Sequence, residues 1–242
     1  MKENIKKLVN QFKITLFHIA PLHLISNITF RLSRIEDFII KNFLIKTYTS
    51  IFKIKLDEYK IKNIDEYSSL NGFFTRELDL SFRKPLIHDD NIISPCDGTI
   101  AGFGEISNDT FIHAKKHRYS TKELIHENID TFHNGKFINI YLEPKDCHRI
   151  YMPCDAILTK VTHVPGSLYS VAPYATIGIR KLYSRNERVI LSFQNSKFIM
   201  SMIMIGAVNV GCISLSDKGI IAPAKHRDSI IEFENKNKKY EY

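Results

Sequence analysis

The chain has 242 residues, of which 44% are hydrophobic and 25% are charged, and this composition excludes a disordered or low-complexity protein. The formal net charge of +8 is concentrated at one end, because residues 1–62 hold 12 Lys and Arg against 5 Asp and Glu. The remaining 180 residues carry a net charge of only +1. A protein that binds a polyanion over its whole surface is therefore disfavoured.

The cysteines indicate a reducing, cytoplasmic environment. Cys96, Cys147, Cys154 and Cys212 include no Cys-x-x-Cys pair, and four cysteines are too few for a disulfide scaffold of this length. No small-residue cleavage site follows the first apolar stretch, so the sequence does not predict a secretory signal.

Residues 1–62 predict basic amphipathic helices. The first helix has an apolar stripe with a 3.6-residue period, formed by Ile5, Leu8, Val9, Phe12, Leu16 and Ile19. Pro21 interrupts this helix, and a second apolar series follows at 28–44. The 17 residues between Lys13 and Arg31 lack charged side chains, but they include His, Ser and Asn residues that are costly in hydrocarbon. We therefore expect these helices to lie in a membrane interface and not to span it.

Two main interpretations of the basic helices in residues 1–62 stay open. The helices can rest on an anionic leaflet, where each Lys or Arg contributes about 1 kcal/mol. Alternatively, they cap the protein's own core and their lysines are merely solvated. Nucleic-acid binding is a third option, but no recognition motif accompanies the charge, and we expect no nucleic-acid partner.

From about residue 71, short segments rich in Ile, Val and Phe alternate with Gly, Pro and Asn, a pattern typical of β-strands. The predicted strands are Thr99–Phe103, Phe137–Leu142, Ala156–Val164, Arg188–Phe193 and Phe198–Val210. A helix is predicted at Ser120–Glu127, where Ser120 and Glu123 match a capping box. The terminal run Asn235–Tyr242 is polar and lacks an obvious closing element. The predicted fold class is α+β, with N-terminal amphipathic helices followed by a β-rich, barrel- or sandwich-like body.

Two clusters hold ionisable residues that could act in catalysis. Asp97 stands in the Pro-led turn Ser94–Gly98. An Asp there is usually a turn residue, although its carboxylate could orient a base. The second cluster is a Pro-bounded loop after a predicted strand, and it contains Asp146, His148 and Arg149. The ordinary pKa of His lies near neutrality, so His148 could act as a general acid or base, although a loop His is more often a surface residue.

The third cluster joins the turn Val164–Val171 to the charged segment Arg185–Val189, which the sequence alone suggests is a solvated hairpin loop. Metal binding is not expected. Cys147, His148 and Cys154 lack a familiar ligand spacing, and His113 and His117, four residues apart, fall in a predicted strand and turn.

In this order, the motifs resemble those of bacterial phosphatidylserine decarboxylases of the pyruvoyl-dependent type. The resemblance covers roughly residues 65–225. The matching pieces are Phe73-Phe74-x-Arg76-x-Leu78 with Arg83 and Pro85, Ser94-Pro95-x-Asp97-Gly98, Tyr141-Leu142-x-Pro144-x-Asp146-x-His148-Arg149, Met152-Pro153-Cys154, Val164-Pro165-Gly166 with Ser170-Val171, Asn186-Glu187-Arg188-Val189, Gly206-Ala207 and Val210-Gly211.

The resemblance implies conversion of phosphatidylserine to phosphatidylethanolamine and CO2. The substrate amine would form a Schiff base with a pyruvoyl group that the protein generates from one of its serines. By the same resemblance, Asp97 serves self-cleavage, Asp146 supports the site, and His148 acts in decarboxylation or reprotonation. Tyr151 stands where the family has a second His, and a phenol with an ordinary pKa of about 10 is a poor base at neutral pH.

Residues 1–242 contain no Leu-Gly-Ser-Thr, the family's cleavage segment, and their one Gly-Ser pair belongs to the Val-Pro-Gly turn. We therefore expect the pyruvoyl group to derive from a serine not present in residues 1–242. Residues 1–62 would then be a membrane-associating region, and residues 63–242 the large-subunit portion of a decarboxylase domain.

The resemblance also implies a set of partners and a location. Expected partners are phosphatidylserine, an anionic membrane surface, a small pyruvoyl-bearing subunit and a second copy of the chain in a homodimer. The expected location is the cytoplasmic face of the cell membrane, as a peripheral protein. The alternative is an inactive, decarboxylase-like protein that binds lipid surfaces.

Overall fold

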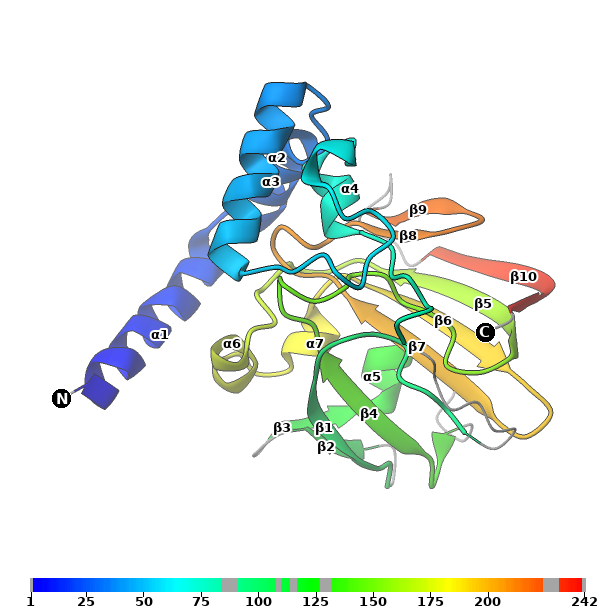
Figure 1. Cartoon of the computed structure of the whole chain (residues 1–242). Helices are drawn as coiled ribbons and strands as arrows, with labels where there is room; N and C mark the ends of the chain where they lie inside the picture. The colour runs from blue at the N-terminus through cyan, green and yellow to red at the C-terminus, as the bar shows by residue number, and fades with distance from the viewer. Residues whose placement is uncertain are drawn as a thin grey trace. The chain divides into compact units, whose positions relative to one another are not determined.

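The chain forms two compact units, each built from segments that are distant in sequence. The first comprises Met1–Asn27, Ile100–Asn139 and Ala156–Lys239, and the second comprises Ile28–Thr99, Ile140–Asp155 and Tyr240–Tyr242. Helices come first and strands dominate the rest, which confirms the α+β class (Figure 1). The structure, a computed structural model, describes residues 2–83, 91–107, 110–113, 117–126, 132–223 and 231–240.

Three helices open the chain: α1 Lys2–Ile19, α2 Leu22–Leu32 and α3 Phe38–Phe52. Pro21 separates α1 from α2, as predicted, because proline has no amide hydrogen to donate. The second apolar series is divided between α2 and α3. Asp37 caps α3 by accepting hydrogen bonds from the amides of Ile39 (3.1 Å) and Ile40 (3.0 Å). Over the described part of the chain, the helices fall short of the length and apolar character that crossing a bilayer requires.

The shorter helices are η1 Ile64–Glu66, α4 Leu70–Phe74, α5 Thr121–Ile125, α6 Pro173–Gly178 and α7 Leu182–Arg185. The predicted cap of α5 is confirmed, because the hydroxyl of Ser120 accepts a hydrogen bond from the amide of Glu123 at 3.3 Å. The helix ends earlier than predicted, since His126 takes a left-handed φ of 58°. Neither α6 nor α7 was predicted, because four to six residues are too few to display a helical period.

The strands form open sheets and, over the described residues, no closed barrel. The largest sheet has the order β10-β5-β6-β7 (Figure 1). Its strands are β5 Ala156–Val164, β6 Arg188–Gln194, β7 Ile199–Ile205 and β10 Ile231–Tyr240. The polar terminal run, predicted to lack a closing element, thus lies largely in β10. Three two-stranded sheets pair β1 Thr99–Glu105 with β4 Lys136–Tyr141, β2 Thr110–His113 with β3 His117–Ser120, and β8 Ile213–Leu215 with β9 Gly219–Ala222.

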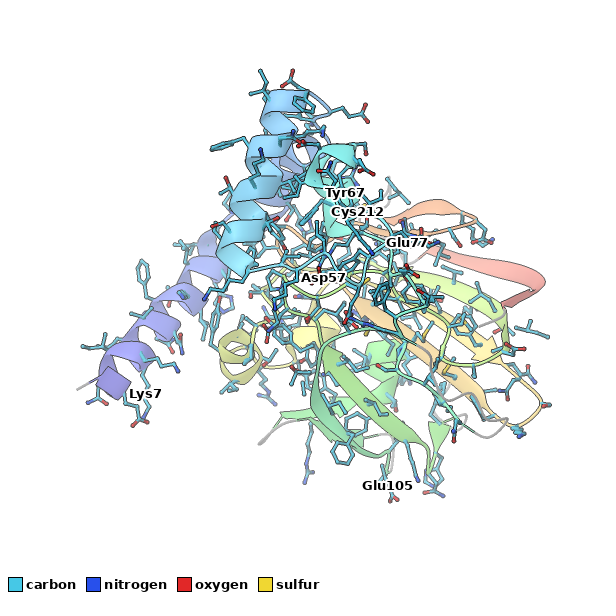
Figure 2. All side chains as sticks on the ribbon, in the orientation of Figure 1. Lys7, Asp57, Tyr67, Glu77, Glu105 and Cys212 are labelled. Carbon is cyan, nitrogen blue, oxygen red and sulfur yellow. The ribbon has the colours of Figure 1, made fainter. Side chains whose placement is uncertain are left out.

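The apolar stripe of α1 is not the face by which this helix packs on the core. Ile14, which is 7% exposed, joins the core of the first unit, and the ring of Phe17 stacks on Tyr174 of α6 at 6.4 Å between centroids. At about 100° per residue, these two positions lie opposite the predicted stripe. Every residue of that stripe is at least 45% exposed. Lys7 lies near the N-terminal end of the same helix (Figure 2) and pairs with Glu3 at 3.8 Å.

The third cluster is buried, so the expectation of a solvated hairpin loop is wrong. Asn186, Glu187 and Arg188 are each at most 2% exposed. Nδ2 of the Asn186 side chain donates to the carbonyl of Gly206 at 2.8 Å, and Glu187 bonds Nε2 of His163 at 2.9 Å. These contacts give the buried side chains of Asn186 and Glu187 hydrogen-bond partners inside the protein.

Arg188 connects two helix ends to the main sheet. Its guanidinium donates to the carbonyls of Glu123 and Leu124 in α5, each at 2.8 Å, and to that of Ser184 in α7 at 2.9 Å. Helix C-termini present unpaired carbonyls and a partial negative charge, which a cation satisfies. Desolvation lowers the pKa of Arg188 to about 10, so the side chain remains charged at neutral pH.

Replacing Arg188 should destabilise the fold. Arg188→Ala leaves several buried carbonyls without a donor, and we expect it to lower the free energy of unfolding by at least about 3 kcal/mol. Arg180, which is exposed, provides the control, since Arg180→Ala should change this value by no more than about 0.5 kcal/mol. Urea unfolding followed by circular dichroism measures both. Equal midpoints for the two variants would contradict the capping role of Arg188.

Candidate active site

A buried arginine fixes the loop in which two of the predicted site residues lie. Arg76 is 1% exposed, and its Nη2 donates to the carbonyls of Lys145 and Asp146, the latter at 3.0 Å. The guanidinium lies over the ring of Tyr59 at 4.4 Å from its centroid. The thiol of Cys147 donates in turn to the carbonyl of Arg76 at 3.5 Å. The backbone of this loop is therefore held by one cation in the protein interior.

Asp97 lies at the end of a chain of charged groups. Its carboxylate accepts hydrogen bonds from Nη1 of Arg83 and from the amide of Cys147, the latter at 3.3 Å. Arg83 also donates from Nε to Glu58 at 2.8 Å. Charge-assisted bonds of this kind are strong and directional. The Asp97 carboxylate is thus fixed in direction beside the loop that contains Asp146.

The Asp97 turn needs a glycine to lie where it does. Gly98 has a φ of 135°, and a Cβ there would stand 2.5 Å from the carbonyl oxygen of Tyr141. The turn is also paired with the segment after His148, because the amide of Tyr151 donates to the carbonyl of Pro95 at 2.8 Å. In the Asp97-Gly98 pair, Asp97 therefore supplies the carboxylate, and Gly98 supplies the backbone conformation that the turn requires.

Asp146 shapes its own loop. Its Oδ2 accepts a hydrogen bond from the amide of Glu143 at 2.6 Å, and its own amide donates to the carbonyl of Glu143 at 2.9 Å. This reciprocal pair closes a tight turn. Tyr48 of α3 anchors the same turn by donating to the carbonyl of Pro144 at 2.8 Å.

His148 is partly buried and lies flat against an aromatic ring. It stacks on Phe74 at 3.9 Å between ring centroids, and its Nε2 lies 3.1 Å from the carbonyl oxygen of Glu143. Because a carbonyl only accepts, Nε2 holds the ring proton and Nδ1 keeps its lone pair. Burial, with a smaller contribution from Arg76, lowers the pKa of His148 from 6.5 to about 4. At neutral pH the ring is uncharged, so its pKa is not near neutrality as the sequence suggested.

Tyr151 is the residue that the sequence resemblance predicts at the position of the family's second His. Among the described residues, its hydroxyl accepts a hydrogen bond from the amide of Leu78 at 3.3 Å and forms none with Asp97. Burial raises the pKa of this phenol further, so it is a still weaker base at neutral pH.

Asp97 and Asp146 line one cavity of about 310 Å³ within the second unit. The other lining residues are Lys53, Ile54, Lys55, Asp57, Glu58, Tyr59, Arg83 and Lys145. The structure thus brings two predicted site residues together, whereas His148 and Tyr151 are not among the lining residues. Burial raises the pKa of Cys96 to about 11, with the charges of Asp97 and Asp146 adding to the effect. This thiol is therefore not a thiolate nucleophile at neutral pH.

The sequence did not predict the part of the cavity wall that lies at 53–59, because that segment falls in the basic N-terminal quarter. A weak local signal exists in its alternation. Ile54 and Leu56 pack into the core of this unit, whereas Lys53, Lys55 and Asp57 are exposed. Such alternation is typical of an extended segment at a surface, but nothing in it indicates which surface.

The chain is similar to curated proteins over most of its length. The family model described as Phosphatidylserine decarboxylase matches residues 70–238, a range that includes Asp97, Asp146 and His148. A relative from Alkalilimnicola ehrlichii, named phosphatidylserine decarboxylase proenzyme, is 38% identical over 89% of this chain and 76% of its own length. Relatives of the same name from Pseudoalteromonas atlantica and Pseudoalteromonas translucida are each 36% identical, over 88% and 91% of this chain and 76% and 77% of their own lengths.

The lowered pKa of His148 predicts a pH dependence of stability. The unfolded chain protonates this His below about pH 6.5, whereas the folded chain does so only below about pH 4. Between these values the unfolded state binds more protons, so the free energy of unfolding should fall as the pH is lowered, by at most about 3 kcal/mol. Comparing urea unfolding of the wild type and His148→Gln at several pH values measures the effect. The same slope in both proteins would show that His148 titrates normally.

Proposed function

Because the chain belongs to the phosphatidylserine decarboxylase family, we propose that it converts phosphatidylserine to phosphatidylethanolamine and CO2. The observation that supports this most directly is the family match, which extends across the loop held by Arg76 and the cavity residues Asp97 and Asp146. The names of the relatives do not favour an inactive lipid-binding protein.

The proposal includes a pyruvoyl group derived from a serine outside residues 1–242. When present, this group supplies an electron-withdrawing carbonyl for the electron pair left behind by CO2. Lys145 is paired with Glu143 at 3.0 Å, and this pairing raises the pKa of the Lys145 ammonium. Lys145 therefore stays protonated and does not compete with the substrate amine as a nucleophile.

We assign three site residues as the family resemblance implies. Asp97 serves self-cleavage, and its fixed carboxylate suits the orientation of a neighbouring group. Asp146 is a positioning residue, because it shapes the turn beside the cavity. His148 acts in decarboxylation or reprotonation. Its neutral ring does not stabilise the substrate carboxylate, whereas a cation there would bind the ground state and oppose loss of CO2.

We further propose that the exposed stripe of α1 docks on an anionic leaflet, so that the protein is peripheral on the cytoplasmic face of the membrane. The exposed apolar residues and the neighbouring lysines Lys6, Lys7 and Lys13 support an interfacial helix. A small pyruvoyl-bearing subunit and a second copy of the chain complete the proposed partners.

Decarboxylation can be tested directly. The protein as its gene encodes it, with any sequence beyond residue 242, should release labelled CO2 from carboxyl-labelled phosphatidylserine. His148→Gln should lower kcat by about 100-fold or more, the usual contribution of a general acid or base. His133, which is exposed, provides the control, and His133→Gln should leave kcat unchanged. Binding of phosphatidylserine without release of CO2 would favour the inactive alternative.

Membrane docking can be tested by co-sedimentation with vesicles. Phe12→Glu should weaken binding to vesicles containing anionic lipid by at least about tenfold, since it removes a large apolar side chain from the interface. Ile177→Glu is a matched control, because Ile177 is also exposed (62%) but lies on α6. Binding of the wild type should weaken as salt is added. If both variants bind equally well, the α1 stripe is not the docking face.

A further inference from the structure

The cavity that Asp97 and Asp146 line also contains charged groups that no internal contact uses. Arg83 is engaged by Glu58 and Asp97, and Lys145 is paired with Glu143. Over the described part of the chain, Lys53, Lys55 and Asp57 form no ion pair or side-chain hydrogen bond. Two cations and one anion therefore line the cavity with their charges available.

These three residues are exposed and line the same cavity. Lys53 ends α3 in a left-handed conformation with a φ of 53°. Leu56, which stands between Lys55 and Asp57, packs beside the buried cluster of Tyr59, Leu78 and Cys147. Ile54 and Leu56 anchor the segment by packing on the core, and Lys53, Lys55 and Asp57 line the cavity together with Ile54. Asp57 follows α3 in this segment (Figure 2).

We propose that Lys53, Lys55 and Asp57 are specificity-determining residues that bind the head group of the lipid substrate. A phosphoserine head group has two anions, the phosphodiester and the carboxylate, and one cation, the ammonium. Lys53 and Lys55 supply positive charge for an anion of this head group, and Asp57 supplies negative charge for its ammonium. This inference rests on the proposed function, because that function names the head group.

The chemistry decides which cation binds what. The carboxylate leaves as CO2, so a lysine held on it would stabilise the ground state and slow the reaction. The phosphodiester is unchanged in the reaction, so binding it contributes to affinity without raising the barrier. Lys53 and Lys55 therefore bind the phosphodiester, and Asp57 attracts the ammonium.

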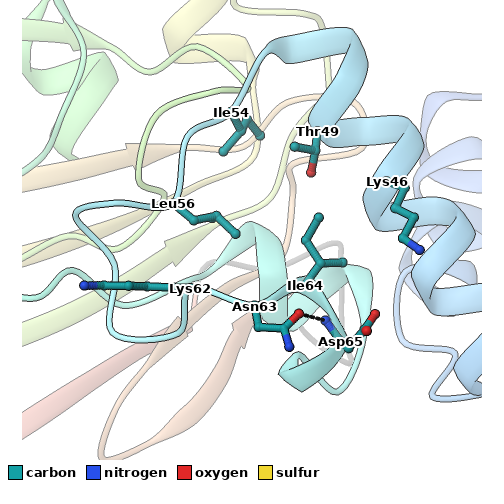
Figure 3. Close-up of a pocket in the computed structure, with 8 residues that line it drawn as sticks. All are labelled: Lys46, Thr49, Ile54, Leu56, Lys62, Asn63, Ile64 and Asp65. Carbon is teal, nitrogen blue, oxygen red and sulfur yellow. Dashed lines mark hydrogen bonds between the residues drawn. The ribbon is translucent and has the colours of Figure 1, made fainter.

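The larger cavity of the same unit, about 540 Å³, offers a contrast (Figure 3). It also has two lysines, Lys46 and Lys62, around the apolar side chains of Ile54, Leu56 and Ile64. Its one acid, Asp65, accepts a hydrogen bond from Nδ2 of the Asn42 side chain at 2.8 Å. No predicted site residue lines it. Lys46 and Lys62 therefore have the same charge as Lys53 and Lys55, but they line a different cavity.

The test measures binding of water-soluble glycerophosphoserine to the purified chain by isothermal titration calorimetry. Lys53→Ala with Lys55→Ala should weaken binding by about tenfold or more, whereas Lys46→Ala with Lys62→Ala should change it less than about twofold. Asp57→Asn should weaken binding of glycerophosphoserine and leave that of glycerol phosphate, which lacks an ammonium, unchanged. All five substituted positions are exposed, so circular dichroism should show the same fold in every variant.

Each outcome decides one question. Equal weakening by the two lysine pairs would overturn the assignment, because general positive charge would then explain binding. Unchanged binding in both lysine variants would overturn it as well. Release of CO2 from phosphatidylserine with an unchanged KM in Lys53→Ala/Lys55→Ala would leave the proposed function standing and sink this inference. If head-group binding depends on Lys53 and Lys55 but the protein releases no CO2, this inference stands and the proposed function is overturned.

Discussion

The need to satisfy the buried guanidinium of Arg76 determines the geometry of the candidate site. A cation that is 1% exposed is very costly unless its donors are used. Nη2 of Arg76 is directed at the carbonyls of Lys145 and Asp146, Nη1 is directed at that of Phe73, and the ring of Tyr59 covers one face. Meeting this requirement places the amide of Cys147 against Asp97. The positions of Asp97 and Asp146 at the cavity therefore depend on Arg76, a buried cation that is not among the lining residues.

The ion pairs around Arg83 have a different task. Arg83 and Glu58 have side chains that are 41% and 49% exposed, and exposed pairs contribute about 0–1 kcal/mol each. Their value lies in direction, since together they hold Asp97 beside a segment that is 39 residues earlier in the chain. Arg76 therefore holds the backbone of the loop, and Arg83 orients one carboxylate.

The sequence predicted what local patterns determine. The bounds of β5, the break at Pro21 and the cap of α5 by Ser120 were all correct, because alternation, proline and capping are local signals. Contacts between distant segments were not predictable. Ile14 packs in the core although it lies outside the apolar stripe of α1, and the polar strand β10 pairs with β5 against its own composition. The prediction of a solvated loop at Arg185–Val189 was wrong for the same reason, because the sequence does not show that α5, distant in the chain, packs against Arg188.

The site residues divide in the same way. Asp97, Asp146 and His148 stand in recognisable motifs, but the environment that sets their chemistry comes from elsewhere in the fold. Burial of the His148 ring, which stacks on Phe74, lowers its pKa and keeps it neutral, although the hydrogen bond to the carbonyl of Glu143 acts in the opposite direction. No motif reports this environment. A neutral ring suits a reaction that must avoid stabilising a leaving carboxylate, while cations remain useful for a group that does not react. Under the proposed function, separating neutral from charged side chains in this way would let one site hold an anionic lipid without opposing the loss of its carboxyl group.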